Sequence, residues 1–148
     1  FMLFSLARTM RLIHSAKLTS SERFWIRNPF SVYFGWVTIA TIANVTTFLV
    51  KRHFVLLSFS EEVATCIVLL LGLTVTTIVM LIYKDLVYGM VALWAYFGIL
   101  FKHIDVAAFN GEYPQIITVV SLNMIVTVLA MLYISYQKYK RLRKKYSN

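Results

Sequence analysis

The segment EEVATCIVLLLGLTVTTIVMLIYKD, residues 61–85, decides which kind of protein this chain forms. Its residues 63–83 carry no charge, and a helix needs about 20 predominantly apolar residues to cross the hydrocarbon core of a bilayer. Ser60 and the two glutamates after it supply a helix N-cap and acids in the first turn, where the helix dipole favours negative charge. The segment therefore predicts a transmembrane helix over residues 63–83.

The composition of the whole chain also indicates a membrane protein. Of the 148 residues, 59% are hydrophobic and 14% are charged, whereas soluble domains are about half apolar and about a quarter charged. The chain has 15 Lys and Arg residues and 6 Asp and Glu residues, but its apolar runs leave no soluble face for a basic stripe. We therefore expect no nucleic-acid partner. The single cysteine, Cys66, excludes an internal disulfide.

Three further segments have the length and composition of membrane spans. Residues 30–50 carry no charge and follow an Asn-Pro pair, and residues 116–136 follow a turn-rich segment. The segment 86–103 is shorter, but a lysine near its end can extend its ammonium group to the membrane surface, which lets the helix continue. The sequence thus predicts four full spans.

We expect an all-α fold, a polytopic transmembrane helix bundle with four full spans plus an N-terminal truncated helix. The truncated helix is expected in residues 1–18, because the apolar residues Phe1–Ala7 look like the end of a membrane helix that was cut partway along its length. We therefore expect the chain to be the C-terminal part of a longer protein. Residues 1–148 are expected to form one transmembrane domain that ends in a basic cytoplasmic tail, 137–148.

Basic residues are distributed unevenly between the two sides of this topology. The side with the tail has 12 Lys and Arg residues, and the other side has 3, namely Lys51, Arg52 and Lys102. Cytoplasmic loops of membrane proteins carry an excess of Lys and Arg. We therefore expect a multi-pass protein of the cell membrane with a cytoplasmic C-terminus and an external loop 53–62.

The segment 30–50 contains the main candidate site. Tyr33, Trp36, Ala40 and Asn44 are three or four residues apart, so they share one face of a helix. The amide of Asn44 is costly in hydrocarbon unless it is paired, so we expect it to face the bundle interior. This stripe either packs against a neighbouring helix through a hydrogen bond and aromatic contacts, or it faces a ligand in a cavity.

Two other features of the sequence, a pair of small residues and an asparagine, suit packing between helices. Ser31 and Gly35 form a pair of small residues, four apart, which allows a close helix contact. Asn123, in the last span, is predicted to be a second buried amide with a structural role.

A set of polar residues at the outer rim has two interpretations. His53 and His103 are expected at the outer rim, with four charged residues at similar depth: Lys102, Asp105, Glu61 and Glu62. A His and carboxylate set can bind a metal or titrate. Their spacing is no metal-ligand motif, and interfacial His and Lys most often anchor a helix. We therefore favour anchoring and expect neither a bound metal nor a cofactor.

Three strings in this order resemble one family of membrane proteins. They are PFSVYFGWVTIATIAN (29–44), VALWAYFGILFKH (91–103) and GEYPQI (111–116). Together they are similar to the larger branch of the TspO/MBR family, the tryptophan-rich sensory proteins related to the translocator protein. The similarity covers about residues 24–137. It implies that residues 30–50 correspond to the fifth helix of the family unit and that further helices follow.

The resemblance implies a membrane receptor or sensor, or a transporter-like protein, that binds flat hydrophobic ligands such as tetrapyrroles or sterols. It makes Trp36 and Asn44 the inherited ligand-binding candidates, with Tyr33 and Ala40 beside them. No catalytic set of side chains is present, so we expect no enzyme. The alternative is a structural or assembly subunit of the membrane without a small-molecule ligand. The expected partners are the lipid bilayer and such a ligand, with a homo-oligomer left open.

Overall fold

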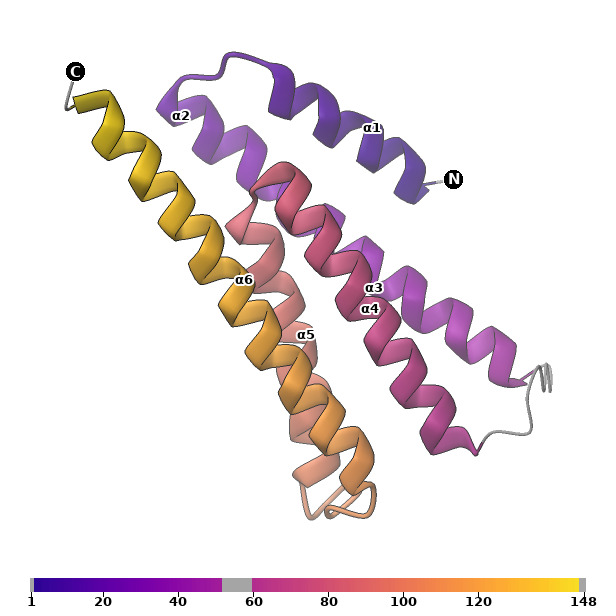
Figure 1. The fold of residues 1–148 in the computed structure, drawn as a ribbon. Helices are drawn as coiled ribbons and strands as arrows, with labels where there is room; N and C mark the ends of the chain where they lie inside the picture. Colours follow the sequence, from indigo (N-terminus) through magenta and orange to yellow (C-terminus); the bar gives the residue numbers. More distant parts are fainter. Residues whose placement is uncertain (1, 52–59, 147–148) are drawn as a thin grey trace.

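The computed structural model describes residues 2–51 and 60–146, and every regular element in these residues is a helix (Figure 1). The all-α fold class is therefore confirmed for the described residues. In chain order the elements are α1 (Met2–Ser15), α2 (Ser20–Glu22), the π-helix η1 (Arg23–Arg27), α3 (Asn28–Lys51), α4 (Glu61–Tyr83), α5 (Leu86–Ile104) and α6 (Pro114–Tyr146).

Three helices of the described residues are long and apolar enough to cross a membrane. They are α4, α5 and the part Pro114–Lys144 of α6, with mean hydropathies of 2.6, 1.4 and 2.2 in their most apolar windows. These helices contain the predicted spans 63–83, 86–103 and 116–136. The fourth predicted span, 30–50, lies in the 24-residue helix α3, which is not among the three. The count of four spans therefore stays a prediction.

The helices form a bundle in which α6 packs along α4 and α5 (Figure 1). Helix α3 packs mainly on α5, and α1 lies against α3 on the side away from α6. The α4–α5 turn and the C-terminus lie toward one end of the bundle, and the α5–α6 turn lies at the opposite end.

Two apolar clusters form the core. The first gathers side chains from all five long helices, including Met10 of α1, Phe34 of α3 and Tyr88 of α5. The second joins α4, α5 and α6 around Ala92 and Val120. Helix α1 contributes side chains to the first cluster and none to the second, so its apolar contacts lie at one end of the bundle.

The predicted close contact of small residues is confirmed. Ser31 is fully buried, and a Cβ atom placed on Gly35 would lie 3.1 Å from Cβ of Val91 on α5. The missing side chain of Gly35 therefore allows α3 and α5 to approach each other closely at their crossing.

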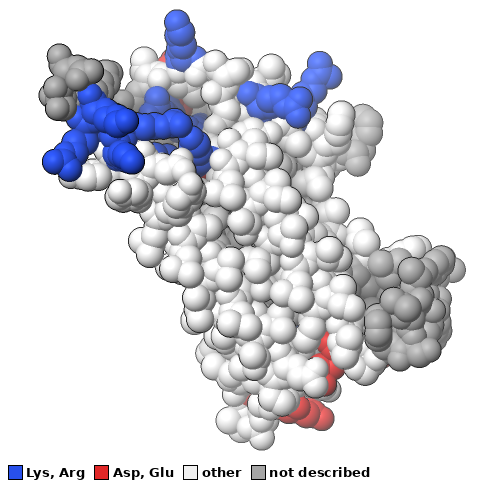
Figure 2. Space-filling model, in the orientation of Figure 1, with Lys and Arg blue, Asp and Glu red and all other residues white. Residues whose placement is uncertain are grey.

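Charged side chains separate toward the two ends of the bundle. Lys and Arg gather at the upper end in Figure 2, near α1 and the C-terminal part of α6, and the larger acidic patches lie at the lower end. Glu61, Glu62, Asp105 and Glu112 all belong to the helix starts and turns of this lower end. Because cytoplasmic loops of membrane proteins are rich in Lys and Arg, the separation of basic and acidic residues agrees with the expectation that the basic end lies in the cytoplasm.

This orientation can be tested by labelling cysteines in intact cells. In a Cys66→Ser background, we expect a membrane-impermeant thiol reagent to label Ala107→Cys, in the exposed α5–α6 turn, without permeabilisation. Ser21→Cys, exposed at the basic end, should react only after the cells are permeabilised. Preferential labelling of position 21 in intact cells would show the opposite orientation.

The α3–α5 crossing generates a prediction about stability. Gly35→Leu should lower the free energy of unfolding by about 1–3 kcal/mol or more, because the new side chain must displace Val91. Gly98→Leu is the matched control, since nothing lies within 4 Å of a Cβ at Gly98. Thermal unfolding in detergent measures both variants. Equal melting temperatures for the two would contradict the tight crossing.

Candidate functional site

The predicted stripe lies on one face of α3, and most of that face is exposed. Tyr33 is 47% exposed and Trp36 is 56% exposed. Asn44 is also exposed, and Ala40 is half-buried between them. The spacing of the four residues therefore correctly predicted a shared face.

The prediction that Asn44 faces the bundle interior is wrong. The interior face of α3 is formed instead by Ser31, Phe34, Gly35 and Thr38, all of which are buried. The hydroxyl of Thr38 donates to the carbonyl oxygen of Phe34 at 2.8 Å, so this polar residue is accommodated inside. Helical periodicity groups residues on a face, but close approach at Gly35 decides which face meets α5.

The exposed stripe has the chemistry of a surface that binds a flat ring. Indole and phenol rings provide stacking area, and the Asn44 amide provides a hydrogen-bond donor and acceptor. At one edge of the stripe, the Tyr33 hydroxyl lies 3.5 Å from the sulfur of Met2, so α1 borders this face. No group of three or more His, Cys, Asp or Glu side chains that could hold a metal ion occurs among the described residues.

A buried carboxylate at the α4–α5 turn links the helices at the basic end. Asp85 is only 4% exposed. Its Oδ1 atom accepts hydrogen bonds from the backbone N–H groups of Val87 at 3.0 Å and Tyr88 at 3.3 Å. Asp85 is thus the N-cap of α5, and it satisfies backbone donors that would otherwise be unpaired at the start of that helix.

The second oxygen of Asp85 receives partners from three other elements. Oδ2 accepts a hydrogen bond from the Ser31 hydroxyl on α3. Nε2 of His14, on α1, lies 3.4 Å from the same oxygen, and Nε of Arg27, on η1, lies 3.8 Å from it. Arg27 also donates to the carbonyl oxygen of Tyr83 at 3.2 Å. One carboxylate therefore ties α1, η1, α3 and α5 together.

This environment keeps Asp85 ionised. Burial acts to raise the pKa of its carboxyl group. The close approach of His14, hydrogen bonds from Ser31 and the Tyr88 N–H, and the charge of Arg27 together outweigh burial and hold that pKa below its ordinary value of 3.8. The cluster is thus a negative centre surrounded by donors.

The second predicted amide, Asn123, is buried as expected. It has no exposed surface, and its Nδ2 atom donates to the carbonyl oxygen of Leu69 at 2.9 Å. This hydrogen bond joins α6 to α4 in the middle of the bundle. Asn123 thus has the structural role that the sequence predicted.

The residues predicted at the outer rim contact neighbours in α5 and in the α5–α6 turn. Nδ1 of His103 lies 2.8 Å from the carbonyl oxygen of Ile99, and its ring packs on Phe109 with centroids 4.9 Å apart. The ammonium of Lys102 lies 5.2 Å from the centre of the Phe109 ring. The side chain of Asp105 accepts from the Ala107 N–H at 3.0 Å. His53 lies outside the described residues.

The sequence did not reveal the Asp85 cluster. An acid between two apolar segments is a signal for a helix N-cap, and it could have identified Asp85 as the cap of α5. Nothing in the sequence marks His14 or Ser31 as its partners, because they lie 71 and 54 positions away.

The sequence model of a family described as TSPO-like protein matches residues 1–142 of this chain. No curated protein and no solved structure matches it.

The Asp85 cluster predicts a large loss of stability when the carboxylate is removed. Asp85→Ala should lower the free energy of unfolding by about 2–4 kcal/mol, because α5 loses its cap and Arg27 loses its buried partner. Asp105→Ala, which removes the acid of an exposed turn, should cost about 1 kcal/mol or less. A similar cost for both variants in thermal unfolding would show that the cluster holds nothing together.

The pH dependence of stability follows from the lowered pKa of Asp85. Its contribution is fully present above its unfolded pKa, near 3.8, and disappears as the pH falls through the lower pKa of the folded state. The wild-type protein should therefore lose more stability below pH 3.8 than Asp85→Asn does. Parallel pH profiles for the two proteins would contradict this linkage.

Proposed function

Because this chain belongs to the TSPO-like protein family, we propose that it is a membrane receptor, sensor or transporter-like protein that binds flat hydrophobic ligands on the exposed face of α3. The family suggests a membrane protein of the sensor or transporter type, and it is generally non-enzymatic. Tetrapyrroles are the ligand class that we propose, with Trp36 and Asn44 as the main contacts and Tyr33 and Ala40 beside them. We propose no catalytic activity.

The outward position of Asn44 is the observation that supports this proposal most. Asn44 lies within the predicted span 30–50, and an amide without a partner in hydrocarbon costs on the order of 1–3 kcal/mol. A bound molecule with polar substituents would satisfy the amide, while its ring system stacks on Trp36 two turns away. The stripe thus combines a stacking surface with a polar group that requires a partner.

A comparison with the exposed face of α5 supports α3 as the ligand-binding helix. Trp94 and Phe97 are 72% and 53% exposed there, as much as the aromatic residues of α3. No amide or carboxylate side chain accompanies them within α5, so this face suits contact with lipid tails alone. Aromatic exposure alone therefore does not select a ligand surface; the nearby amide does.

The same stripe also suits a second role, in which another protein helix covers it. Asn side chains form hydrogen bonds between membrane helices, and Ala40 would allow a close approach. In that case the protein is a structural or assembly subunit without a small-molecule ligand. The binding experiment below separates the two roles.

A tetrapyrrole titration tests the ligand site. In the full-length protein in detergent, protoporphyrin IX should bind saturably at micromolar concentration and quench tryptophan fluorescence. Trp36→Leu should weaken this binding about fivefold, because the loss of one stacking aromatic costs about 1 kcal/mol. Porphyrin absorbance reports the affinity in every variant, including those that lack Trp36.

Trp94→Leu provides the matched control, since it removes an indole of α5 that is 72% exposed, more than the 56% of Trp36. Its affinity should equal that of the wild type, and circular dichroism should show the same helix content in both variants. Equal affinities for Trp36→Leu and Trp94→Leu, or the absence of saturable binding, would contradict the ligand site and leave the structural subunit as the better description.

A further inference from the structure

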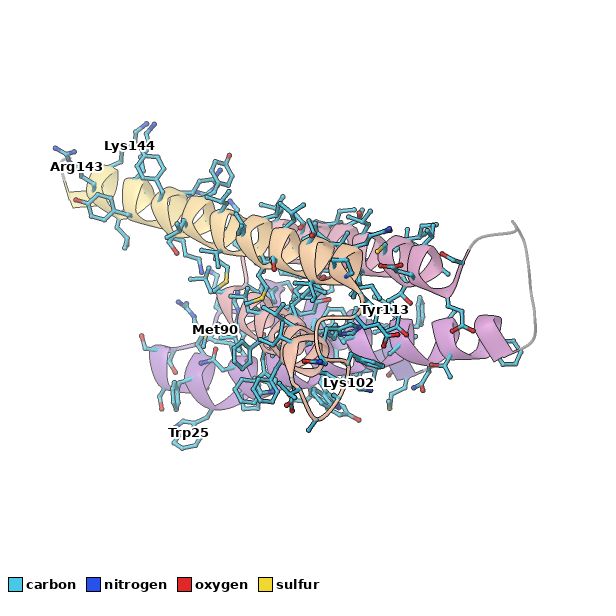
Figure 3. The ribbon with its side chains drawn as sticks, turned by 90° about the horizontal axis from the view of Figure 1, so that it is seen from below. Trp25, Met90, Lys102, Tyr113, Arg143 and Lys144 are labelled. Atoms are coloured by element: carbon cyan, nitrogen blue, oxygen red, sulfur yellow. The ribbon has the colours of Figure 1, made fainter. Side chains whose placement is uncertain are left out.

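Helix α6 is longer than a membrane crossing requires. Its 33 residues span about 50 Å at 1.5 Å per residue, whereas the hydrocarbon core is about 30 Å thick. Its apolar residues end near Tyr136, and the helix continues through a segment rich in Lys and Arg. Figure 3 shows Arg143 and Lys144 projecting from this free end of the helix. The last turns of α6 therefore lie at the membrane surface or beyond it.

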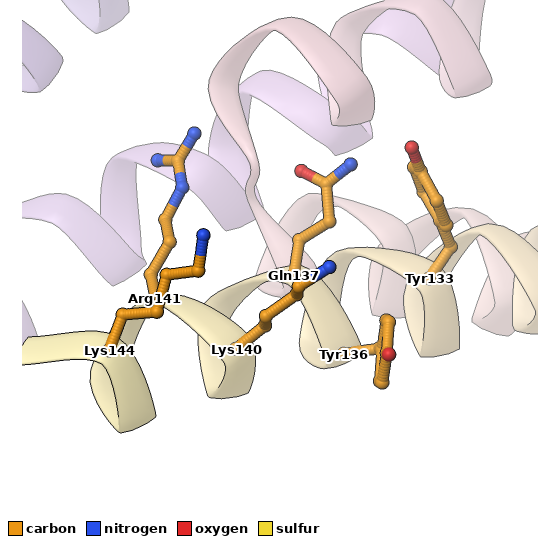
Figure 4. Close-up of a pocket in the computed structure, with 6 residues that line it drawn as sticks. All are labelled: Tyr133, Tyr136, Gln137, Lys140, Arg141 and Lys144. Carbon is orange, nitrogen blue, oxygen red and sulfur yellow. The ribbon is translucent and has the colours of Figure 1, made fainter. Parts of the chain in front are cut away.

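A hollow of about 410 Å³ lies beside these turns (Figure 4). It is lined by aromatic, amide and cationic side chains: Tyr133, Tyr136, Gln137, Lys140, Arg141 and Lys144. Figure 4 shows Tyr133, Gln137, Arg141 and Lys144 extending from α6 toward the same side. The guanidinium of Arg141, with its five N–H donors, and the ammonium groups of Lys140 and Lys144 thus border one space. Hydroxyl and amide donors of the tyrosines and of Gln137 border the same space.

The cations of the hollow have no acidic partners in the described chain. No Asp or Glu follows Glu112 in the sequence, and the ion pairs among the described residues all involve Asp85. Lys140, Arg141 and Lys144 are exposed, so only solvent screens their mutual repulsion, and an anion in the hollow would reduce it further. The chemistry of the hollow fits a phosphate group, which accepts hydrogen bonds from Arg, Lys and Tyr donors.

We propose that this hollow binds the headgroup of an anionic phospholipid. The face of α6 that leads into it supports a lipid rather than a free anion. Leu132 and Leu129 are 61% and 59% exposed and lie about two and three turns before Lys140. Tyr133 and Tyr136 separate the apolar and charged parts. Acyl chains can lie along the leucines while the headgroup phosphate meets Lys140 and its neighbours. This site is distinct from the α3 stripe.

The proposal is tested with soluble short-chain lipids and the full-length protein in a neutral detergent. Dioctanoyl phosphatidylserine should bind saturably in isothermal titration calorimetry, and dioctanoyl phosphatidylcholine should bind at least tenfold more weakly. Inorganic phosphate at the same concentrations should give no saturable binding. Phosphate binding as tight as that of the lipid would overturn the proposal in favour of a free-anion site, and equal binding of the two lipids would also overturn it.

Matched triple variants test whether the hollow itself is responsible. Lys140→Gln, Arg141→Gln and Lys144→Gln together should weaken phosphatidylserine binding more than tenfold. Arg8→Gln, Arg11→Gln and Lys17→Gln remove the same charge from exposed positions at the same end of the molecule, and together they should weaken it less than twofold.

A charge-conserving variant guards against misfolding as the cause. Lys140→Arg, Arg141→Lys and Lys144→Arg together should retain binding within about threefold, with circular dichroism unchanged, because all three charges stay in place. Equal losses in the two Gln triples would mean that net charge alone attracts the lipid, and the proposed site would be rejected. Loss of binding in the charge-conserving variant would also reject it.

Discussion

The arrangement of helices at the basic end depends on one buried carboxylate. Asp85 caps α5 with one oxygen and receives Ser31, His14 and Arg27 at the other. A charge buried this deeply is tolerated only because donors from several elements surround it, and this requirement fixes where those elements lie. Without it, α1 would be held to the bundle mainly by apolar contacts around Met10, which are not directional, and by the contact between Tyr33 and Met2.

The position of α3 follows from this constraint together with the crossing at Gly35. Ser31 faces Asp85, and Gly35, one turn later on the same side, lies against Val91 of α5. With that face committed to the bundle, the stripe from Tyr33 to Asn44 must point outward. The proposed ligand surface is therefore a consequence of how the polar cluster orients α3, although the two sets of residues do not touch.

The two ends of the molecule differ in ways that suit different contacts. The basic end combines the Asp85 cluster with cations of α6 that have no acidic partner among the described residues, while Glu61, Glu62, Asp105 and Glu112 lie at the other end. At that other end, His103 and Lys102 pack on Phe109, so both side chains have partners within the protein. Membership of the TSPO-like family and three apolar helices agree with a protein that lies across a bilayer with its two ends in different surroundings.

Much of the fold was determined by the sequence itself. Long uncharged runs form helices because hydrocarbon leaves the backbone no other hydrogen-bond partners. This local rule located α4, the apolar part of α6 and, from a shorter run, α5. The spacing of Tyr33, Trp36 and Asn44 likewise determined that they share a face. Which side of α3 that face occupies was decided only by the tertiary structure. The choice depends on the close approach at Gly35 and on the contact between Ser31 and Asp85, residues 54 positions apart that only folding brings together.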